Sequence, residues 1–347
     1  MIIPMTSSYR FERRTTNKMK KGIKTITAML LAATLTVSLA GCGGSSDEAS
    51  APEETTVDYN SMSLEDLEAQ AKEEGEVASV GMPDTWANWI ETWTEITDTY
   101  GIEHTDLDMS SSEEIAMFKE EGEKGTKDIG DVGQQWGPVA EEEGVTLKYK
   151  TSYWDSIPDW AKDDDGDWVS GYYGTISIIT NDEQIPEAPT SFADILEGDY
   201  KVTIGDTSVA RIESGEIACA LLWDYNALNY RDNAVENNPD ASFTVNIPQD
   251  ASVRSAYATI INKNAPHPAA ACLTREYILS DEGQINLAKG YATPIRDDVE
   301  IPEDVKAKMI DDAQYGDQVQ TIDYDKWTDV TQDVITYWQE NIIPMIQ

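Results

Sequence analysis

The sequence places carboxylates, aromatic rings and hydroxyls in short polar segments that directly follow apolar, strand-like runs. Asp84 and Trp86 follow the first such run, and Ser111 and Ser112 follow the second. Later runs are followed by Gln134, Asp206, Trp223, Asp224 and Tyr225. Carboxylates can hold ammonium groups or metal ions, and ring faces attract cations. These segments therefore favour the binding of a small solute.

Several of these residues also have a purely structural interpretation. Trp86 starts a helical stripe with Trp89 and Trp93. We expect the last two to be core, whereas a ligand contact and a core position both stay open for Trp86. Asp84 could cap this helix, and a capping box from Ser111 to Glu114 explains at least one of the two serines. The better candidates for contacting an amine or a metal ion are Asp206, Asp224 and Tyr225.

Residue patterns typical of catalysis are missing from the sequence. It has two histidines, His104 and His267, and no Gly-x-Ser-x-Gly, Walker, His-Glu-x-x-His or Cys-x-x-Cys pattern. The acidic run Asp163–Asp167 does not fit an EF-hand loop, because its sixth position is Trp168 instead of glycine. We interpret this run as a solvated turn. We therefore predict a binding protein that is not an enzyme and has no cofactor and no metal site.

The start of the chain has the features of a secretory signal. The apolar run Ile26–Ala40 follows Lys20, Lys21 and Lys24 and is shorter than the ~20 residues that cross a bilayer as a helix. The ending Leu39–Cys42 resembles the lipobox of bacterial lipoproteins, and this resemblance implies that Cys42 is lipidated and begins the mature protein. We expect residues 1–41 to be a signal peptide, with Met19 as an alternative start. An ordinary signal peptide with an accidental cysteine is the other interpretation.

The charge of the chain excludes whole classes of partner. The 65 acidic and 25 basic residues give a net charge of −40. A protein of this charge lacks the clustered Lys and Arg that neutralise nucleic-acid phosphates, so nucleic acid is excluded as a partner. Attachment to a membrane must therefore come through lipid on Cys42. Beyond it only Cys219 and Cys272 remain. A disulfide is permitted outside the cell, but the apolar neighbours of Cys219 favour a buried thiol.

Strand-like and helical segments alternate along the rest of the chain. Residues 42–58 are rich in Gly, Ser, Ala, Pro and Glu and predict a flexible linker. We predict helices near 64–74, 86–100, 111–121, 191–196, 268–279, 281–288 and 328–343. We predict strands near 76–81, 102–107, 128–132, 172–180, 202–205, 217–223, 243–248 and 256–262, the last two as a pair. The alternation predicts an α/β fold with mainly parallel sheets.

Seven short segments share their order and spacing with a known family. They are Ala71–Val77, Asp128–Gly133, Pro189–Leu196, Ser214–Ala218, Ala265–Ala271, Leu279–Gln284 and Gly290–Arg296. Together they resemble the solute-binding lipoproteins of ABC importers, in the branch that includes ferric-iron, polyamine and aminophosphonate binders. The resemblance runs from about Leu64 to the C-terminus and implies a type II periplasmic-binding-protein-like fold.

This resemblance implies two lobes that are joined by hinge strands near 172–180 and 253–262, with solute caught between them. The first lobe would hold residues 59–173 and 255–292, and the second 174–254 and 293–347. Relatives usually carry several dozen residues between the strand that ends near Asp206 and the segment at Ser214. This chain crosses in seven, so we expect a shortened second lobe. Ligands of open α/β sheets sit beyond the carboxyl ends of the strands, so the candidate loops should face one cleft.

The same resemblance implies a monomeric receptor, anchored by lipid at the outer face of the membrane or in the periplasm, that closes on its solute and delivers it to an ABC permease. Acidic loops with aromatic rings favour a cation, such as a polyamine. Ferric iron is the alternative. Tyr172 and Tyr173 resemble the tyrosine pairs of ferric binders, although their place in a hinge strand favours hinge packing or ligand stacking. An anion would require Arg211 or Arg254 at the cleft.

Two further classes of function stay open. One is a tethered hydrolase on the same fold, which would need a nucleophile and a base in the cleft. The other is a non-transporting adhesion or signalling protein that kept the fold after it lost part of the second lobe. Loss of all small-ligand binding would distinguish this last class from a transport receptor.

Overall fold

A computed structural model of the chain describes residues 57–199, 201–204, 211–212 and 214–345. Four expectations concern residues that lie outside these ranges: the signal peptide at 1–41, the lipidation site Cys42, most of the linker, and the candidate residue Asp206. In the part of the chain that the structure describes, no helix is both long enough and apolar enough to span a bilayer.

Helices and strands alternate through most of the chain, as the sequence predicts. The helices are α1 (Leu64–Glu74), α2 (Trp89–Tyr100), α3 (Ser111–Glu121), α4 (Gly137–Glu142), α5 (Phe192–Glu197), α7 (Asp224–Asn237), α8 (Pro268–Leu279), α9 (Asp281–Lys289), α10 (Glu303–Lys306) and α11 (Tyr324–Tyr337). The strands are β1 (Glu76–Val80), β2 (Glu103–Leu107), β3 (Ile129–Gly133), β4 (Trp168–Asn181), β5 (Val202–Ile204), β6 (Cys219–Trp223), β7 (Phe243–Asn246), β8 (Ser252–Ile261), β9 (Thr293–Pro294) and β10 (Val319–Thr321).

The strands form one curled, mixed sheet in the order β2-β1-β3-β8-β4-β6-β5. The first three strands pair in parallel, and so do β5 and β6, which agrees with the predicted parallel character. The long strands β4 and β8 add antiparallel pairs, both with each other and with β3 and β6. The strands β7 and β8 do not pair with each other as predicted, because each pairs with β4.

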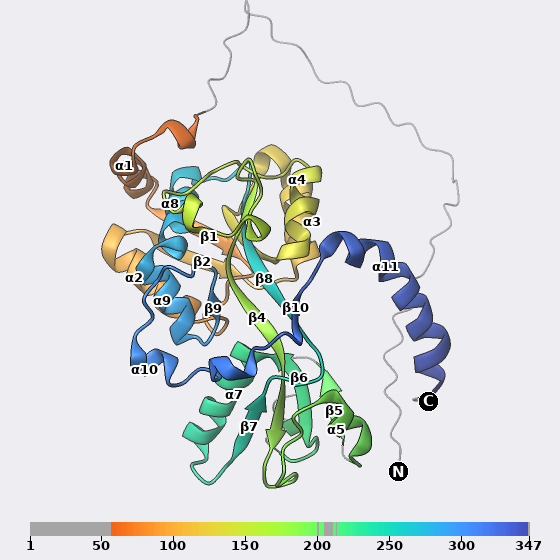
Figure 1. Cartoon of the computed structure of the whole chain (residues 1–347). Helices are drawn as coiled ribbons and strands as arrows, with labels where there is room; N and C mark the ends of the chain where they lie inside the picture. Colours follow the sequence, from red (N-terminus) through yellow and green to blue (C-terminus); the bar gives the residue numbers. More distant parts are fainter. Residues whose placement is uncertain (1–56, 200, 205–210, 213, 346–347) are drawn as a thin grey trace, which may run out of the picture. The chain divides into compact units, whose positions relative to one another are not determined.

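Strands β4 and β8 run side by side through the middle of the molecule, from one lobe into the other (Figure 1). The first part of β4, up to Thr175, pairs with β8, and its second part, from Ile176, pairs with β6. These are the predicted hinge strands. Because side chains alternate across a strand, neighbours such as Tyr172 and Tyr173 point to opposite faces of the hinge.

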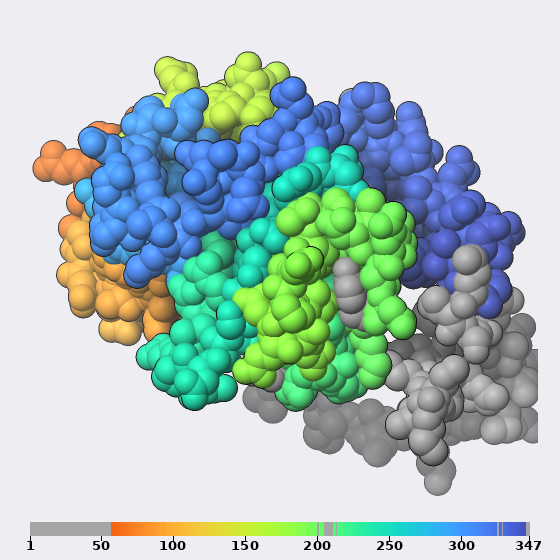
Figure 2. Space-filling model, turned by 60° about the horizontal axis from the view of Figure 1, so that its bottom comes forward, coloured from red at the N-terminus to blue at the C-terminus, as the bar shows by residue number. Residues whose placement is uncertain are grey.

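Each lobe has its own apolar core. The core of the first lobe gathers residues of α1, α2 and α8, among them the fully buried Trp89 and Leu273. The second contains Ile179 of β4 and Leu222 of β6. The segment after α9, drawn in blue, lies against the green and teal segments of this lobe in Figure 2, and there Ile310 joins the second core. Cys219 and Cys272 are buried free thiols, as predicted for Cys219.

The outer edge of the second lobe is thinly covered. Ile204 of β5 is 71% exposed and Leu196 of α5 is 86% exposed. Apolar side chains on a sheet and its covering helix are normally buried against another layer. This exposure agrees with a shortened second lobe.

Several helices differ from the sequence prediction, which missed α4 and α7 and placed α11 at 328–343 instead of 324–337. Helix α2 begins at Trp89 instead of near Trp86, because Ala87 and Asn88 have positive φ angles of 45° and 61° and cannot continue a right-handed helix. Helix α3 begins one residue after its N-cap Ser110, whose amide and hydroxyl both bond to Glu113. The capping box is therefore Ser110–Glu113, one residue earlier than predicted.

Candidate functional site

A cavity of about 740 Å³ lies where the loop after β1, the start of α3 and the helix α7 meet. We call it the cleft cavity. Its lining includes the acids Asp108, Glu114 and Asp131 and the rings of Trp86, Tyr230 and Tyr257. No Lys or Arg belongs to the described residues that line it. A smaller cavity of about 290 Å³ adjoins it and shares Thr85, Asn226, Asn229 and Asn233.

The loop between β1 and α2 that brings Trp86 to the cavity is conformationally strained. Positive φ angles are rarely adopted by residues with a side chain, and two occur here in succession, at Ala87 and Asn88. The loop is held by Gly290, where an added Cβ would lie 2.7 Å from both the Ala87 carbonyl carbon and the Asn88 Cβ. Strain of this kind concentrates at binding sites, where it fixes side chains in position.

Trp86 begins a chain of hydrogen bonds that ends on a buried carboxylate. Its indole N–H donates to the hydroxyl of Tyr172 (2.6 Å), which in turn donates to Asp131 Oδ2 (2.7 Å). The ring of Tyr172 stacks on Tyr257 with centroids 5.4 Å apart, and Tyr225 of the second lobe meets Trp86 edge-on at 5.5 Å. The aromatic cluster therefore positions the acid and joins the two lobes at the cavity.

Burial raises the pKa of the Asp131 carboxyl well above its ordinary value, although the hydrogen bond from Tyr172 lowers it. Burial, followed by the nearby Asp131 charge, likewise raises the pKa of the Tyr172 phenol well above its ordinary value. The phenol consequently keeps its proton and acts as a donor to the acid.

Glu114 is a second buried acid at this cavity, and its side chain is only 1% exposed. Its carboxyl group lies between two glycines: a Cβ at Gly81 would come within 2.4 Å of one oxygen, and a Cβ at Gly130 within 2.5 Å of the other. The oxygen Oε2 has no hydrogen-bond partner in the described structure. Burial raises the pKa of Glu114 well above its ordinary value, and repulsion from Asp131 adds to this.

The second lobe presents a buried polar group to the same space. Asn226, near the start of α7, is 6% exposed, and its Nδ2 finds no acceptor among the described residues. A buried amide without a partner loses the hydrogen bond that it would make in water. Unpaired polar groups thus line the cavity from both lobes, where a bound solute could satisfy them.

The structure brings only some of the candidates from the sequence to the cleft. Trp86 and Ser111 line the cleft cavity, and Asp84 and Tyr225 line the smaller one that adjoins it. Ser112 is exposed at the start of α3, and Gln134 is buried and donates to the carbonyl of Trp160. Trp223 packs against the core of the first lobe. Tyr173 lines a different cavity on the other face of the hinge.

Asp224 lies beneath the site as a structural anchor. Its Oδ1 accepts from the amides of Thr175 (3.0 Å) and Tyr225 (2.9 Å), and its Oδ2 accepts from the hydroxyl of Tyr315 (2.8 Å). Burial raises its pKa to about 6. These bonds connect strand β4 to the first turn of α7 and so fix the helix that carries Asn226.

The lining residues that the sequence did not identify include Asp108, Glu114, Asp131, Asn226, Asn229, Tyr230, Asn233 and Tyr257. Glu114 was assigned to the capping box, which actually uses Glu113, and this one-residue difference leaves Glu114 to face the cavity. Asp131 interrupts an otherwise apolar strand, and a carboxylate in a buried strand is the signal that could have identified it.

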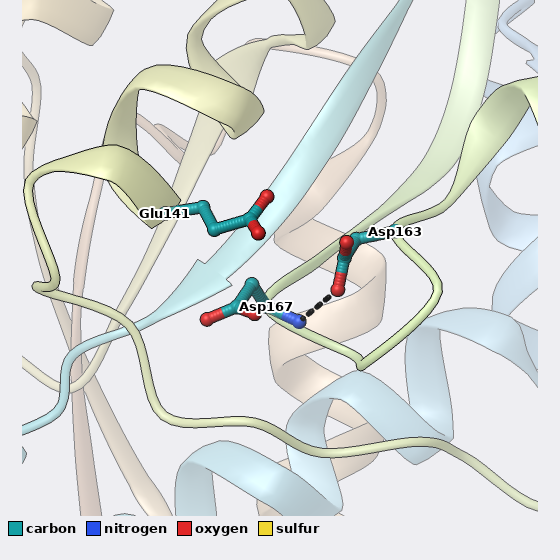
Figure 3. Close-up of side chains that lie close together, drawn as sticks. All are labelled: Glu141, Asp163 and Asp167. Carbon is teal, nitrogen blue, oxygen red and sulfur yellow. Dashed lines mark hydrogen bonds between the residues drawn. The ribbon is translucent and has the colours of Figure 1, made fainter.

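A separate group of acids gathers at the turn after residue 162 (Figure 3), where carboxylate oxygens of Glu141, Asp163 and Asp167 lie within 4.8 Å of one another. The segment is a turn, as predicted, because Asp163 Oδ2 accepts from three successive amides that end at Asp167. Lys148 Nζ lies 3.3 Å from Asp167 Oδ2 and supplies a compensating charge. The carboxylates of this group are thus already bonded to backbone amides or paired with Lys148. Their acidity alone does not identify a metal site.

Solved structures similar to this chain share its fold at low sequence identity. The apo ferric ion-binding protein A of Pasteurella haemolytica superposes with a TM-score of 0.60 at 14% identity, over 77% of this chain and 97% of its own. The ferric binding protein of Campylobacter jejuni gives 0.58 at 18% identity, over 76% and 98%. A protein described as the Atu4243 GABA receptor gives 0.58 at 15% identity, over 76% and 96%. These structures are two-lobed binding proteins.

No curated protein sequence matches the chain at a significant level. The sequence profile of the family described as "Bacterial extracellular solute-binding protein" matches residues 125–211 and 202–330, which together exceed half of the chain. The matched residues include both hinge strands, Asp131 and the start of α7. With its hinged fold and its cavity between lobes, the chain belongs to the bacterial extracellular solute-binding protein family.

Proposed function

We propose that this protein captures a small organic cation of the amine class in the cleft cavity and delivers it to an ABC permease. Membership of the family establishes the coarser part: an exported protein that takes a small-molecule ligand and serves an ABC permease. The family and the similar structures are binding proteins, and we propose that this chain likewise releases its solute unchanged.

The observation that carries the ligand class is the charge of the cleft cavity. Three acids line it without a single Lys or Arg among its described lining residues. The ring of Trp86 offers a face for a cation. The start of α3, which could otherwise attract an anion, is already capped by the carboxylate of Glu113.

The two arginines that an anionic ligand would require lie elsewhere. Arg211 forms an exposed ion pair with Glu216 at 2.7 Å. Arg254 lines a cavity on the opposite face of the hinge strands. An anion in the cleft would instead face the carboxyl groups of Glu114 and Asp131, and their repulsion would weaken its binding. The same two groups would attract a cation.

Ferric iron is the second candidate, because two of the similar structures are ferric binding proteins. The described cleft residues support it less well. No three ligand atoms from His, Cys, Asp or Glu converge at the cleft within 4.8 Å in the described chain. The Tyr172 phenol keeps its proton and donates a hydrogen bond to Asp131, and it would have to lose that proton to bind a metal ion. Another of the similar structures is described as a GABA receptor.

Closure about the hinge is the mechanism that the geometry supports. A solute that bonds to Glu114 on one lobe and to Asn226 on the other stabilises the closed state, which the permease can then recognise. We propose lobe bounds of 59–173 with 255–292 and 174–254 with 293–347, since the two cores fall largely within them. We also propose that the protein acts as a monomer.

A thermal-shift screen of the mature protein tests the ligand class. The panel is putrescine, spermidine, 4-aminobutyrate, ferric citrate, phosphate and methylphosphonate. A ligand at a hundred times its Kd stabilises the folded state by about 2.7 kcal/mol. We therefore expect at least one amine to raise Tm by on the order of 5 °C. A rise with ferric citrate alone would support the second candidate, and a rise with the anions alone would contradict both.

We further propose that Cys42 carries the lipid that holds the receptor at the outer face of the membrane or in the periplasm. The proposal is supported by the lipobox-like ending Leu39–Cys42 and by the linker that follows it. In Cys42→Ser, we expect the protein to leave the membrane fraction for the soluble one. Mass spectrometry of the wild-type N-terminus should show a lipidated cysteine, and an unmodified N-terminus at any other residue would refute the anchor.

A further inference from the structure

A second cavity, of about 570 Å³, lies on the other face of the hinge strands. We call it the hinge cavity. Tyr173 of β4 and Arg254 of β8 form its inner wall. Alternation along the strands separates them from Tyr172 and Tyr257, which belong to the aromatic cluster at the cleft. The two cavities therefore share strand β8 but open to different faces.

Arg254 brings a half-buried positive charge and one unpaired N–H donor to the hinge cavity. Its guanidinium lies over the ring of Tyr173, 5.0 Å from the centroid. Its Nε is buried and has no hydrogen-bond partner in the described part of the chain. A guanidinium has five N–H donors in a planar fork that fits the two oxygens of a carboxylate. In a chain of net charge −40, a buried cationic donor without an acceptor is unexpected.

The rest of the lining restricts what can bind beside Arg254. Apolar surface comes from Pro294, Ile301, Met309 and Ile310. Lys306 also lines the cavity, and so do two acids, Asp311 and Asp312. The two acids would repel a phosphate or another dianion more strongly than a monoanion. The cavity thus combines a guanidinium that fits a carboxylate with an apolar surface on which the rest of a small ligand could pack.

We propose that the hinge cavity binds a small monocarboxylate with an apolar body. Its carboxylate accepts from the fork of Arg254, and its body packs against Tyr173 and Met309. The proposal does not depend on the ligand of the cleft, because it uses none of the residues that line the cleft cavity.

Titration of the mature protein with benzoate and hexanoate tests this site, with benzamide and hexanamide as uncharged counterparts of the same shape. By isothermal calorimetry or ligand-observed NMR, we expect a carboxylate to bind and its amide to bind at least tenfold more weakly. Arg254→Gln should weaken carboxylate binding at least tenfold. Arg211→Gln, which removes an exposed arginine that does not line the cavity, should leave carboxylate binding unchanged.

Arg254→Gln is expected to fold, since its Nε makes no hydrogen bond that would be lost, and an unchanged Tm and circular dichroism spectrum check this. Met309→Trp, which fills the cavity with a larger side chain, should also abolish binding. The proposal is overturned if neither carboxylate binds the wild-type protein, if the amides bind equally well, or if Arg254→Gln binds as the wild type does.

Discussion

Arg275→Ala is expected to lower the free energy of unfolding by about 3 to 5 kcal/mol, a large fraction of the stability of a typical domain. The guanidinium of Arg275 is fully buried and no carboxylate pairs with it in the described structure. It donates instead to Thr259 Oγ1 (3.0 Å) and to the carbonyls of Tyr149 (2.9 Å), Gly166 (3.0 Å) and Thr259 (2.9 Å). Alanine would leave three buried carbonyls without this donor and open a cavity.

The midpoint of urea unfolding at pH 7 measures this effect. Arg275→Lys retains a positive charge but cannot supply the planar fork, so we expect an intermediate loss. Arg211→Ala removes an exposed arginine and should change the midpoint little. A midpoint for Arg275→Ala equal to that of Arg211→Ala would show that the buried fork contributes nothing to stability.

Glu114→Gln should have opposite effects on the empty protein and on ligand binding. In the empty protein the variant should be more stable near neutral pH, because it removes a carboxylate that burial and Asp131 disfavour. Cation affinity should fall on the order of 100-fold, because a hydrogen bond to a charged partner contributes about 1.5–3 kcal/mol. Glu113→Gln is the matched control, since Glu113 caps α3 and does not line the cavity.

The pH dependence of Glu114 has a defined sign. A raised pKa means that the folded, empty protein binds more protons than the unfolded chain between the ordinary Glu pKa and the raised one. Stability from this group is present at low pH and is lost as pH rises through the raised pKa. The affinity for a cation should rise over the same range, since the cation requires the carboxylate form.

Calorimetry of the screened amine in two buffers with different ionisation enthalpies should therefore detect proton release by the wild type and less release by Glu114→Gln. Equal proton release by the two proteins would contradict the role of Glu114. A full affinity of the variant for the amine would contradict it as well.

The sequence predicted the alternation of elements and the hinge strands, because both depend on local patterns. The range of α8, for instance, is Pro268–Leu279 in the prediction and in the structure. The residues that form the capping box of α3 could not be predicted in this way. Three successive serines precede two glutamates, so Ser110–Glu113 and Ser111–Glu114 both fit a capping box. The contacts of Glu114 with Gly81 and Gly130, which no local pattern contains, distinguish them.

Long-range contacts also decide the other differences. Local propensity gives no reason for Ala87 to adopt a positive φ, and the residue that holds this conformation, Gly290, is distant in sequence. The strand pattern of β7 and β8 is equally compatible with a hairpin. Their actual partner is β4, whose length of 14 residues lets it pair with strands of both lobes. That pairing places Tyr172 and Tyr173 on opposite faces of the sheet. The positions of the two cavities follow from it as well.

The two cavities lie on opposite faces of β8, and this arrangement has a thermodynamic consequence. Asp224 bonds to β4, to α7 and to Tyr315, and Tyr315 lines the hinge cavity while α7 lines the cleft. The two lobes can reorient about the hinge strands. A ligand in one cavity that prefers one orientation of the lobes then alters the affinity of the other cavity for its own ligand. Linkage requires that the reverse effect have the same size. An importer built on this receptor could then adjust its uptake to a second metabolite without an additional regulatory domain.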